Sequence, residues 1–269
     1  MPDKKGGYQE GDDVTEIMGV KQYERTMDVE MHTVPQQKGR YPKWLMRFKL
    51  FRWLFLRKKP KKGGFPNFIS KTDEIRIQNA PSMLLDKGPY IVTEKIDGCS
   101  GTYALVRHKR FLRKDKYEFI VCSRNLQLPV KDGSIYWQVA EKYRIENKLR
   151  NMIGNKDWIA IQGECIGPKI QGNKYHVNEP HFFVFNVITP GGRMGSIDAR
   201  NFCGTRDLNF VPIVQTVYTL PDTVQDMLDF AHGTSQLFDT LREGVVVRSR
   251  DGKKSFKAVD PQFLLKHGE

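Results

Sequence analysis

Long apolar runs are absent from this chain of 269 residues, and their absence excludes one class of protein. No stretch approaches the roughly 18 uninterrupted apolar residues that a membrane-spanning helix requires. The opening residues, Met1-Pro2-Asp3-Lys4-Lys5-Gly6-Gly7, are not followed by the apolar segment of a signal peptide. We therefore expect neither a membrane span nor a secretory leader.

Cysteine is also scarce. Cys99, Cys122, Cys165 and Cys203 form no C-x-x-C pair and do not cluster with histidine at the spacing of zinc ligands. The pattern indicates neither a disulfide framework nor a zinc site. Reduced thiols are typical of the cytoplasm, which is the location that we expect.

Acidic residues are missing from residues 40–62, although 28% of the chain is charged. The net charge of +13 suggests an anionic partner such as a nucleic acid. Ten basic side chains lie in this one segment: Arg40, Lys43, Arg47, Lys49, Arg52, Arg57, Lys58, Lys59, Lys61 and Lys62. Subtracting these 10 charges from +13 leaves +3 for the remainder, so the charge argument concerns this segment above all.

The same segment has aromatic residues at helical spacing. Trp44, Phe48, Phe51 and Phe55 recur at i, i+4, i+7 and i+11, which would place them on one face of a helix. Three interpretations stay open: a helix packed on the neighbouring domain, an arm that contacts nucleic acid, or a helix on a membrane surface.

Composition divides the chain into a basic N-terminal extension, residues 1–62, and a compact domain, residues 63–269. Seven β-rich runs in the domain are predicted strands: Tyr90–Lys95, Gly101–Val106, Tyr117–Ser123, Trp158–Glu164, His181–Val187, Gly244–Arg248 and Ser255–Val259. Strands that follow one another mostly without intervening helices favour an α+β fold of antiparallel sheets with helices outside.

Two helices are predicted in this domain. One lies near Ser134–Met152. The other runs from about Asp222 to His232, because Asp222 and Gln225 form a capping-box pattern and Gly233 provides a stop.

The first candidate for chemistry is Glu94-Lys95-Ile96-Asp97-Gly98. A lysine that ends a β-rich run and is followed by a turn would project from a sheet. Such a lysine becomes a nucleophile when burial or a neighbouring cation lowers its pKa. Asp97 can orient a ligand or a metal ion, and Gly98 allows a bulky substrate to approach the backbone. Alone the pattern is weak, because strands commonly end in such turns.

Four further segments follow in order. They are Glu164 in Ile161–Gly167, Phe185 in the aromatic strand His181–Val187, Glu243 before the run Gly244–Arg248, and Lys257 within Ser255–Val259. Each has a structural explanation by itself, as a surface carboxylate, a core aromatic, a turn residue or a solvated lysine. All five segments in this order are hard to obtain by chance.

This ordered set resembles the covalent nucleotidyltransferase superfamily of ATP-dependent DNA ligases, RNA ligases and mRNA capping enzymes. The resemblance covers roughly Phe65 to Lys266. It implies an α+β, ATP-grasp-like nucleotidyltransferase domain of two antiparallel sheets flanked by helices, with ATP in the cleft. It also implies ATP and Mg²⁺ (or Mn²⁺) as cofactors.

The resemblance implies a role for each candidate residue. Lys95 would attack the α-phosphate of ATP, expel pyrophosphate and carry AMP as a phosphoramidate. The remaining roles are nucleotide binding by Glu94, Asp97, Arg124, Glu164, Phe185 and Lys257, metal binding by Glu243, and RNA contact by Arg76 and Ser100. Within the first group, Glu94 would contact adenine and Phe185 would stack on it. Phosphoryl transfer depends on alignment and charge neutralisation, which lysines and carboxylate-held Mg²⁺ supply.

Three features favour an RNA ligase within this superfamily. DNA ligases usually have Arg two residues after the Gly of the lysine motif, where this chain has Ser100. DNA ligases and capping enzymes carry an OB domain after the last motif, whereas twelve residues follow Lys257 here. Residues 65–79 look like the lead-in of RNA ligases with a front OB module, and Ser123-Arg124-Asn125 resembles a segment that grips nucleotide or RNA.

Two departures from the family pattern are visible. A front OB module needs at least about 45 residues, and only residues 14–24 resemble the junction after it, so we expect a lost, truncated or separate module. The last motif normally reads Lys-x-Lys, but here Val259 follows Lys257. The second lysine is absent or supplied by Lys254 or Lys266.

We therefore expect a monomeric ATP-dependent RNA ligase. It would join RNA 3′-hydroxyl and 5′-phosphate ends through lysyl-AMP and adenylylated RNA, in RNA repair. The alternatives are a DNA ligase, a GTP-using capping enzyme, or a decayed nucleotidyltransferase that only binds nucleic acid. Intact Lys95, Glu164 and Glu243 argue against decay.

Overall fold

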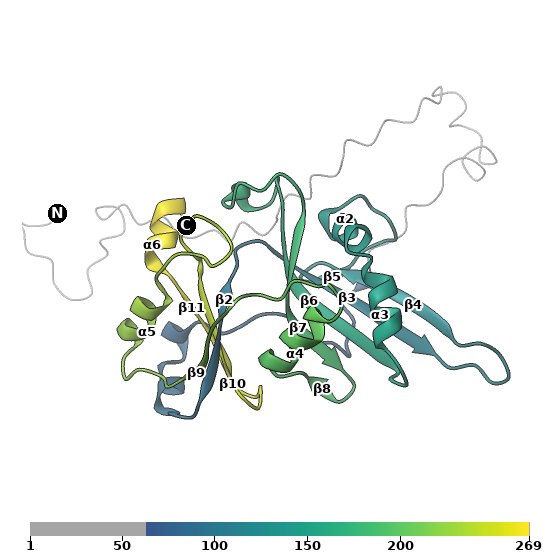
Figure 1. The fold of residues 1–269 in the computed structure, drawn as a ribbon, viewed down its shortest axis with the longest axis horizontal. Coiled ribbons are helices and arrows are strands. Elements are labelled where there is room, and N and C mark those ends of the chain that lie inside the picture. The colour runs from purple at the N-terminus through teal and green to yellow at the C-terminus, as the bar shows by residue number, and fades with distance from the viewer. Residues whose placement is uncertain (1–62, 269) are drawn as a thin grey trace, which may run out of the picture. The chain divides into compact units, whose positions relative to one another are not determined.

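The structure, a computed structural model, describes residues 63–268 (Figure 1). The predicted helix of residues 40–62 and the junction-like residues 14–24 lie outside the described residues. Two antiparallel sheets flanked by helices make up the described part, which confirms the predicted fold class. No helix in residues 63–268 is long and apolar enough to cross a membrane.

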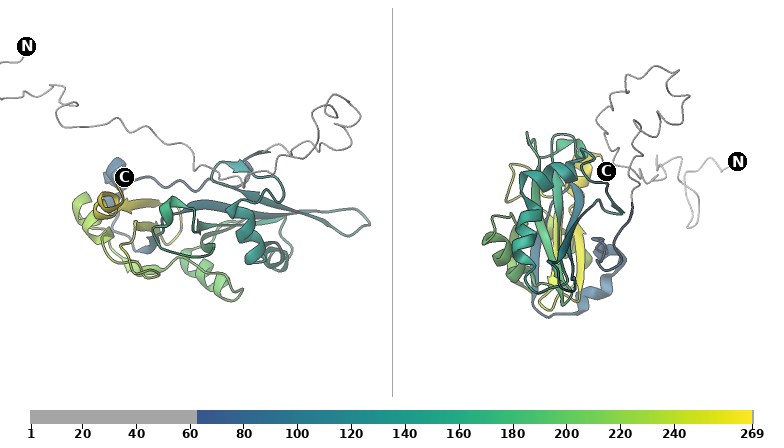
Figure 2. Two further views of the ribbon diagram at one scale, coloured as in Figure 1. Left: turned by 90° about the horizontal axis from the view of Figure 1, so that it is seen from above. Right: turned by 90° about the vertical axis from the view of Figure 1, so that its right-hand side faces the viewer.

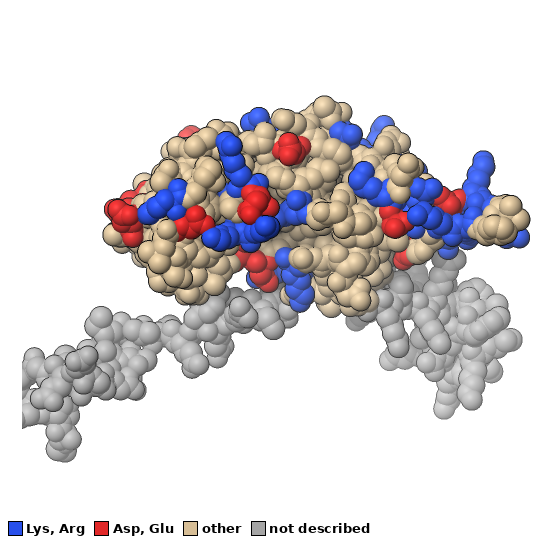
Figure 3. Space-filling model, turned by 90° about the horizontal axis from the view of Figure 1, so that it is seen from below, with Lys and Arg blue, Asp and Glu red and all other residues tan. Residues whose placement is uncertain are grey.

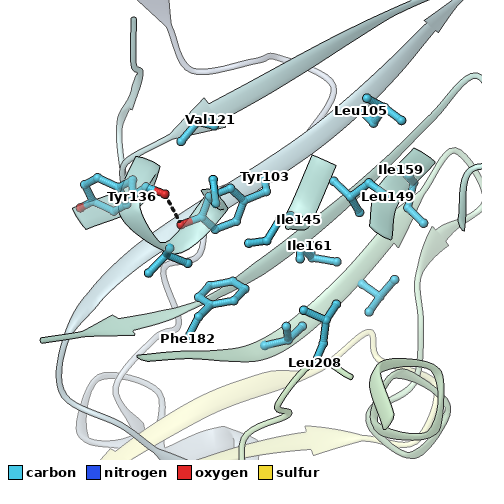
Figure 4. Packing of buried hydrophobic residues seen from close by; sticks show 14 of the residues in the cluster. Tyr103, Leu105, Val121, Tyr136, Ile145, Leu149, Ile159, Ile161, Phe182 and Leu208 are labelled. Atoms are coloured by element: carbon cyan, nitrogen blue, oxygen red, sulfur yellow. Dashed lines mark hydrogen bonds between the residues drawn. The ribbon is translucent and has the colours of Figure 1, made fainter. Parts of the chain in front are cut away.

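Seven strands form the larger sheet, in the order β1-β5-β4-β3-β6-β7-β8. Their bounds are β1 Gly63–Gly64, β3 Cys99–His108, β4 Lys116–Cys122, β5 Leu126–Gln127, β6 Trp158–Ile166, β7 His181–Thr189 and β8 Gly192–Arg193. Side chains alternate between the two faces of each strand. Tyr103, Leu105, Ile161 and Phe182 share one face and form the main core with the helices that cover it (Figure 4).

Three helices supply the other side of this core: α2 Ile135–Lys142, α3 Ile145–Met152 and α4 Ser196–Gly204. A hydrogen bond from Tyr103 Oη to the Tyr136 carbonyl, 2.9 Å long, satisfies the one polar atom of the buried Tyr103 ring. On the opposite face of the sheet, Ala104, Ile120 and Ala160 pack with Ile69 from the segment that enters the domain. Further along the same strands, that second face carries polar side chains.

Four strands form the smaller sheet, in the order β11-β10-β2-β9. Their bounds are β2 Tyr90–Lys95, β9 Ile213–Tyr218, β10 Gly244–Ser249 and β11 Ser255–Val259. Val92, Val247 and Phe256 share a face that packs on α5 Val224–Ala231 and on the short turns η2 Ile77–Asn79 and η3 Pro81–Leu85. Helix α6, Pro261–His267, follows β11 directly.

The two sheets lie side by side and are joined by the turn between β2 and β3 (Figures 1 and 2). An apolar cluster that includes Ile96, Ile166, Tyr175 and Phe183 packs at this turn. Because β2 belongs to one sheet and β3 to the other, side chains from both sheets can contact the residues of the turn.

The predicted strands are all present, whereas both predicted helices needed correction. The helix predicted over 134–152 is two helices, because Arg144 between them has the left-handed conformation with φ of +50°. Helix α5 is capped by Thr223, whose Oγ1 accepts from the Asp226 amide; Asp222 forms an ion pair with Lys87 instead. Strand β9 and helices α4 and α6 were not predicted.

Candidate active site

Lys95 is the last residue of β2, and its partner strand brings a carboxylate to it. In the β2–β10 register Gly244 lies opposite Lys95, so Glu243 precedes the strand at the same edge. The distance from Lys95 Nζ to Glu243 Oε2 is 2.5 Å. Their side chains are 23% and 11% exposed, so water screens the pair only in part.

Gly244 is what allows Glu243 to stand so close. Its φ is +149°, and a Cβ at this position would lie 2.2 Å from the carbonyl oxygen of Ala258 on β11. An L-residue is therefore excluded by both conformation and space. The amide of Asp260 donates to the Glu243 carbonyl at 2.9 Å, which ties the end of β11 to the same point.

The smaller sheet also places Lys257 on the face of Lys95. Thr93, Val246 and Lys257 are directly opposite one another across β2, β10 and β11, and Lys95 follows Thr93 by two residues. Burial lowers the pKa of Lys257, and the charges of Lys95 and Arg76 lower it further, because the cations are close enough to repel one another.

Arg76 and Arg124 reach this group from the lead-in segment and the β4–β5 turn. The Lys257 amide donates to the Ile75 carbonyl at 2.8 Å, which pairs Arg76 with Lys257. Arg124 contributes to the lowered pKa of Lys257 and is ion-paired with Asp73, with half of its side chain exposed. The structure therefore gathers four predicted residues, Lys95, Lys257, Arg76 and Arg124, into one cationic group.

Glu164 comes from the larger sheet. It lies opposite Ser100 in the β3–β6 register, and Ser100 Oγ donates to Glu164 Oε2 at 3.2 Å. Burial raises the pKa of Glu164 well above its ordinary value, although the charge of Lys95 acts in the opposite direction. Glu164 is thus close enough to Lys95 for their charges to interact, and burial is the larger influence on the pKa of Glu164.

Asp97 in the turn is held by the loop between β6 and β7. Lys174 Nζ lies 2.7 Å from Asp97 Oδ2, and the Asp97 amide donates to Tyr175 Oη at 2.7 Å. Gln171 Nε2 donates to the Gly98 carbonyl at 3.3 Å. Burial, followed by the charge of Glu243, raises the pKa of Asp97 to about 6. Lys174 and Tyr175 were not predicted, because a loop residue gains this role only through the fold.

Three carboxylates therefore act on Lys95. Burial would lower the pKa of Lys95, but Glu243, Glu164 and Asp97 outweigh burial, and the net shift is upward. The lowered pKa that would make a lysine a nucleophile is therefore not found at Lys95, because the nearest charges are negative and Glu243 is its ion-pair partner.

Phe185 lies where β6 and β7 lose their regular pairing. Gln162 is opposite Asn186 and Gly163 is opposite Val184, so Phe185 is the extra residue of a β-bulge. A bulge turns a side chain out of the regular alternation. The half-buried Phe185 packs against the aromatic cluster at the β2–β3 turn. Its carbonyl accepts from Arg248 Nη1 at 2.9 Å, which connects β7 to the smaller sheet.

Glu94 has a clear structural partner. Its Oε1 accepts from Ser235 Oγ at 2.5 Å, and its Oε2 accepts from the Gln236 amide at 2.8 Å. The buried carboxylate thereby positions the loop that carries Phe238, whose ring lies 4.4 Å from that of Tyr175. Contact between Glu94 and adenine stays a prediction.

Neither lysine suggested as a substitute for the second lysine of the last motif contacts the group. Lys254 is ion-paired with Asp86, and Lys266 Nζ is 3.4 Å from Thr240 Oγ1. Lys174 is the additional lysine that the fold brings to the group instead.

The carboxylates of the site could bind a metal ion only together with other ligands. No three His, Cys, Asp or Glu side chains within residues 63–268 converge closely enough to bind one by themselves. Glu164 and Asp97 are nevertheless largely buried carboxylates close to Glu243, and burial raises the pKa of each. Such carboxylates fit a hard divalent cation that takes its other ligands from phosphate oxygens and water, the usual mode for Mg²⁺.

Comparison with known proteins agrees with this geometry. The family model described as RNA ligase matches residues 88–259. A solved structure of Naegleria gruberi RNA ligase with PPi is 29% identical, with a TM-score of 0.70, and the match covers 97% of this chain and 68% of that one. A mutant of the same protein with ATP and Mn is 28% identical, with the same TM-score and coverage. Another mutant, with AMP and Mn, is 29% identical at a TM-score of 0.70, with 97% and 68% covered. No curated protein sequence matches the chain.

Proposed function

The chain belongs to the RNA ligase family, and we propose that it is an ATP-dependent RNA ligase in which Lys95 carries AMP. The observation that supports this role is the position of Lys95, 2.5 Å from Glu243 and close to Glu164, Asp97 and Lys257. The charged neighbours of Lys95 come from both sheets and from the turn that joins them.

The first step is attack by the Lys95 amine on the α-phosphorus of ATP. An N–P bond forms and the bond to pyrophosphate breaks. Glu243, which lies 2.5 Å from Lys95 Nζ, or water accepts the proton that Lys95 loses. Lys257, Arg76 and Arg124 bind phosphate oxygens and stabilise the leaving group. Phe185 and Glu94 bind the adenine, and Glu164 binds the ribose or a water molecule.

Glu243, with Asp97 and Glu164, is suited to hold a divalent ion together with the phosphates. Such an ion supplies charge stabilisation to the transferring phosphoryl group. Neutralising these carboxylates also removes the cause of the raised pKa of Lys95, so the amine becomes available as ATP binds. Asp97 is positioned for this by Lys174 and Tyr175.

Two further transfers complete sealing. The AMP moves from Lys95 to the 5′-phosphate of RNA, which restores the lysine. A 3′-hydroxyl then attacks the adenylylated end, forms the phosphodiester and releases AMP. Ser100 and Arg76 are the residues that we place near the RNA in these steps. Repair of broken RNA by a cytoplasmic monomer, with any OB module outside residues 63–269, is the setting that we propose.

Labelling with α-³²P-ATP and a divalent ion tests the mechanism. The parent protein should acquire label and pass it to a 5′-phosphorylated RNA strand, while Lys95→Ala should acquire none. Lys253→Ala removes an exposed lysine at the far end of the smaller sheet and should label as the parent does. Label on Lys95→Ala would reject Lys95 as the AMP carrier.

A further inference from the structure

A second concentration of charge lies far from Lys95, on the hairpin that connects β3 to β4. Residues 108–116, here called the hairpin tip, project beyond the rest of the larger sheet (Figures 1 and 2). Phe111 and Leu112 at its end are 92% and 88% exposed, the two most exposed large apolar side chains in residues 63–268. They contribute no packing to the fold.

Most of the cations on the hairpin tip have no ion-pair partner among residues 63–268. Lys109 pairs with Asp157 at 2.8 Å, and Asp115, the one acid of the tip, accepts from Arg107 Nε at 2.5 Å. Four cations remain without an ion pair among the described residues: Arg110, Arg113, Lys114 and Lys116. In Figure 3 basic side chains gather near one end of the molecule, around an uncharged tip.

The tip is an ordered extension of the sheet. The β3–β4 ladder continues to the pair His108 and Lys116, and His108 Nε2 lies 3.0 Å from Glu118 Oε2. The Arg110 amide donates to Asp115 Oδ1 at 3.3 Å. Leu112 has φ of +57°, a conformation that non-glycine residues rarely take. The fold therefore presents an apolar pair and four cations on a defined support.

We propose that the hairpin tip binds the RNA substrate at a distance from the joint, with cations on phosphates and Phe111 stacked on a base. This proposal rests on the proposed function. Exposed aromatic and basic side chains together are the combination that binds single-stranded or splayed nucleic acid. The same residues would suit an anionic lipid surface, but the strand that carries them ends beside the candidate RNA-sealing site.

The strand sets the distance. β3 begins at Cys99, four residues after Lys95, and reaches His108 after nine steps. At about 3.3 Å per residue it spans roughly 30 Å. B-form DNA rises about 3.4 Å per base step and A-form RNA rises less, so the tip would meet RNA at least about nine steps from the joint. Shorter RNA should not reach it.

The experiment measures RNA binding by Lys95→Ala full-length protein, so that no turnover occurs. One variant changes Arg110, Arg113, Lys114 and Lys116 to Gln. A matched control changes four exposed cations elsewhere: Lys131, Arg200, Arg250 and Lys253. The short RNA is a nicked duplex with arms of about six base pairs, and the long RNA carries about 14 further unpaired nucleotides on each arm, so that only the long RNA extends past the roughly nine steps above and offers unstacked bases there.

The hairpin variant should bind the long RNA at least tenfold more weakly than the parent. Its slope of log K against log salt should fall by up to about 3, because each lost phosphate contact removes about 0.7 to 0.9. The short RNA and the control variant should show neither change. Phe111→Ala should weaken the long RNA about fivefold to a hundredfold, and Phe111→Trp should restore it.

Equal affinity of the parent and the hairpin variant for the long RNA would overturn the proposal. So would an unchanged RNA affinity combined with loss of binding to phosphatidylserine vesicles, which would assign the tip to a membrane. The same hairpin substitutions are also made in protein that keeps Lys95, and labelling of that protein tests AMP transfer. RNA binding by the Lys95→Ala protein tests the hairpin tip, so failure of one proposal can be told from failure of the other.

Discussion

The two ends of strand β3 present charge in opposite ways. At the Cys99 end, Lys95, Asp97 and Glu164 lie close to one another, and the charge of each shifts the pKa of at least one of the others. At the His108 end, four cations are exposed and unpaired among the described residues. In the first region the effect of a charge depends on one partner within about 3 Å. In the second it depends on the number of charges and is screened by salt.

Gly244→Ala should break the compact end most severely. A Cβ there would lie 2.2 Å from the Ala258 carbonyl at a φ of +149°, so β10 and β11 must separate. We expect a loss of more than about 4 kcal/mol in the free energy of unfolding, the range of severe backbone and core lesions. Chemical denaturation measures it, and Gly191→Ala, where a Cβ would make only an ordinary contact of 3.7 Å with Thr189 Oγ1, is the control. A parent-like midpoint would contradict the register of these strands.

Glu243→Gln should affect chemistry more than stability. The amide keeps the shape of the side chain but loses the charge that faces Lys95 at 2.5 Å. We expect the rate of self-labelling to fall by about 10² to 10³, the scale of one lost electrostatic contact in a transition state. Single-turnover labelling measures this rate. If the variant unfolds, or labels at the parent rate, Glu243 does not have the proposed role.

Lys174→Met tests the loop that holds Asp97. The pair is 2.7 Å long, and its side chains are 10% and 11% exposed. Removing one partner of a fully buried pair costs about 3 to 5 kcal/mol, so this slightly exposed pair should cost on the order of 2 kcal/mol. Self-labelling should also slow, because Asp97 loses a positioning contact. Lys131→Met, at an exposed pair 3.9 Å long, should change neither quantity.

His181→Gln gives the smallest expected effect and concerns pH. Burial and then Lys142 lower the pKa of His181 below 6.5. Below pH 6.5 the unfolded chain therefore takes up a proton more readily than the folded one, and stability falls as the pH is lowered through this range. With the side chain about one third exposed, the effect should be a few tenths of a kcal/mol. Melting temperatures from pH 5 to 7 should show a flatter profile for His181→Gln. A steeper profile would contradict the sign.

Much of the fold was predictable because the strands are locally encoded. Alternating or continuous apolar runs bounded by Gly, Pro and Asp define β2, β10 and β11, and the ends of β11 were predicted without error. Helix α3 could not be separated from α2, since nothing in the composition of Tyr143 and Arg144 signals a residue with positive φ. Strand β9 was missed although its sequence is rich in β-branched residues, and none of its side chains is fully buried.

The candidate site shows the same difference between what the local sequence indicates and what only the fold brings together. The sequence by itself predicted which residues carry chemistry, because lysine and glutamate beside glycine-bounded strands are recognisable in the order in which they occur. Only the tertiary structure decided which charges meet. It placed Lys174 on Asp97 and engaged Glu94 with Ser235, and it raised rather than lowered the pKa of Lys95. The physical reason is that a pKa depends on distances between groups far apart in the chain, and such distances are set by strand register rather than by neighbouring residues.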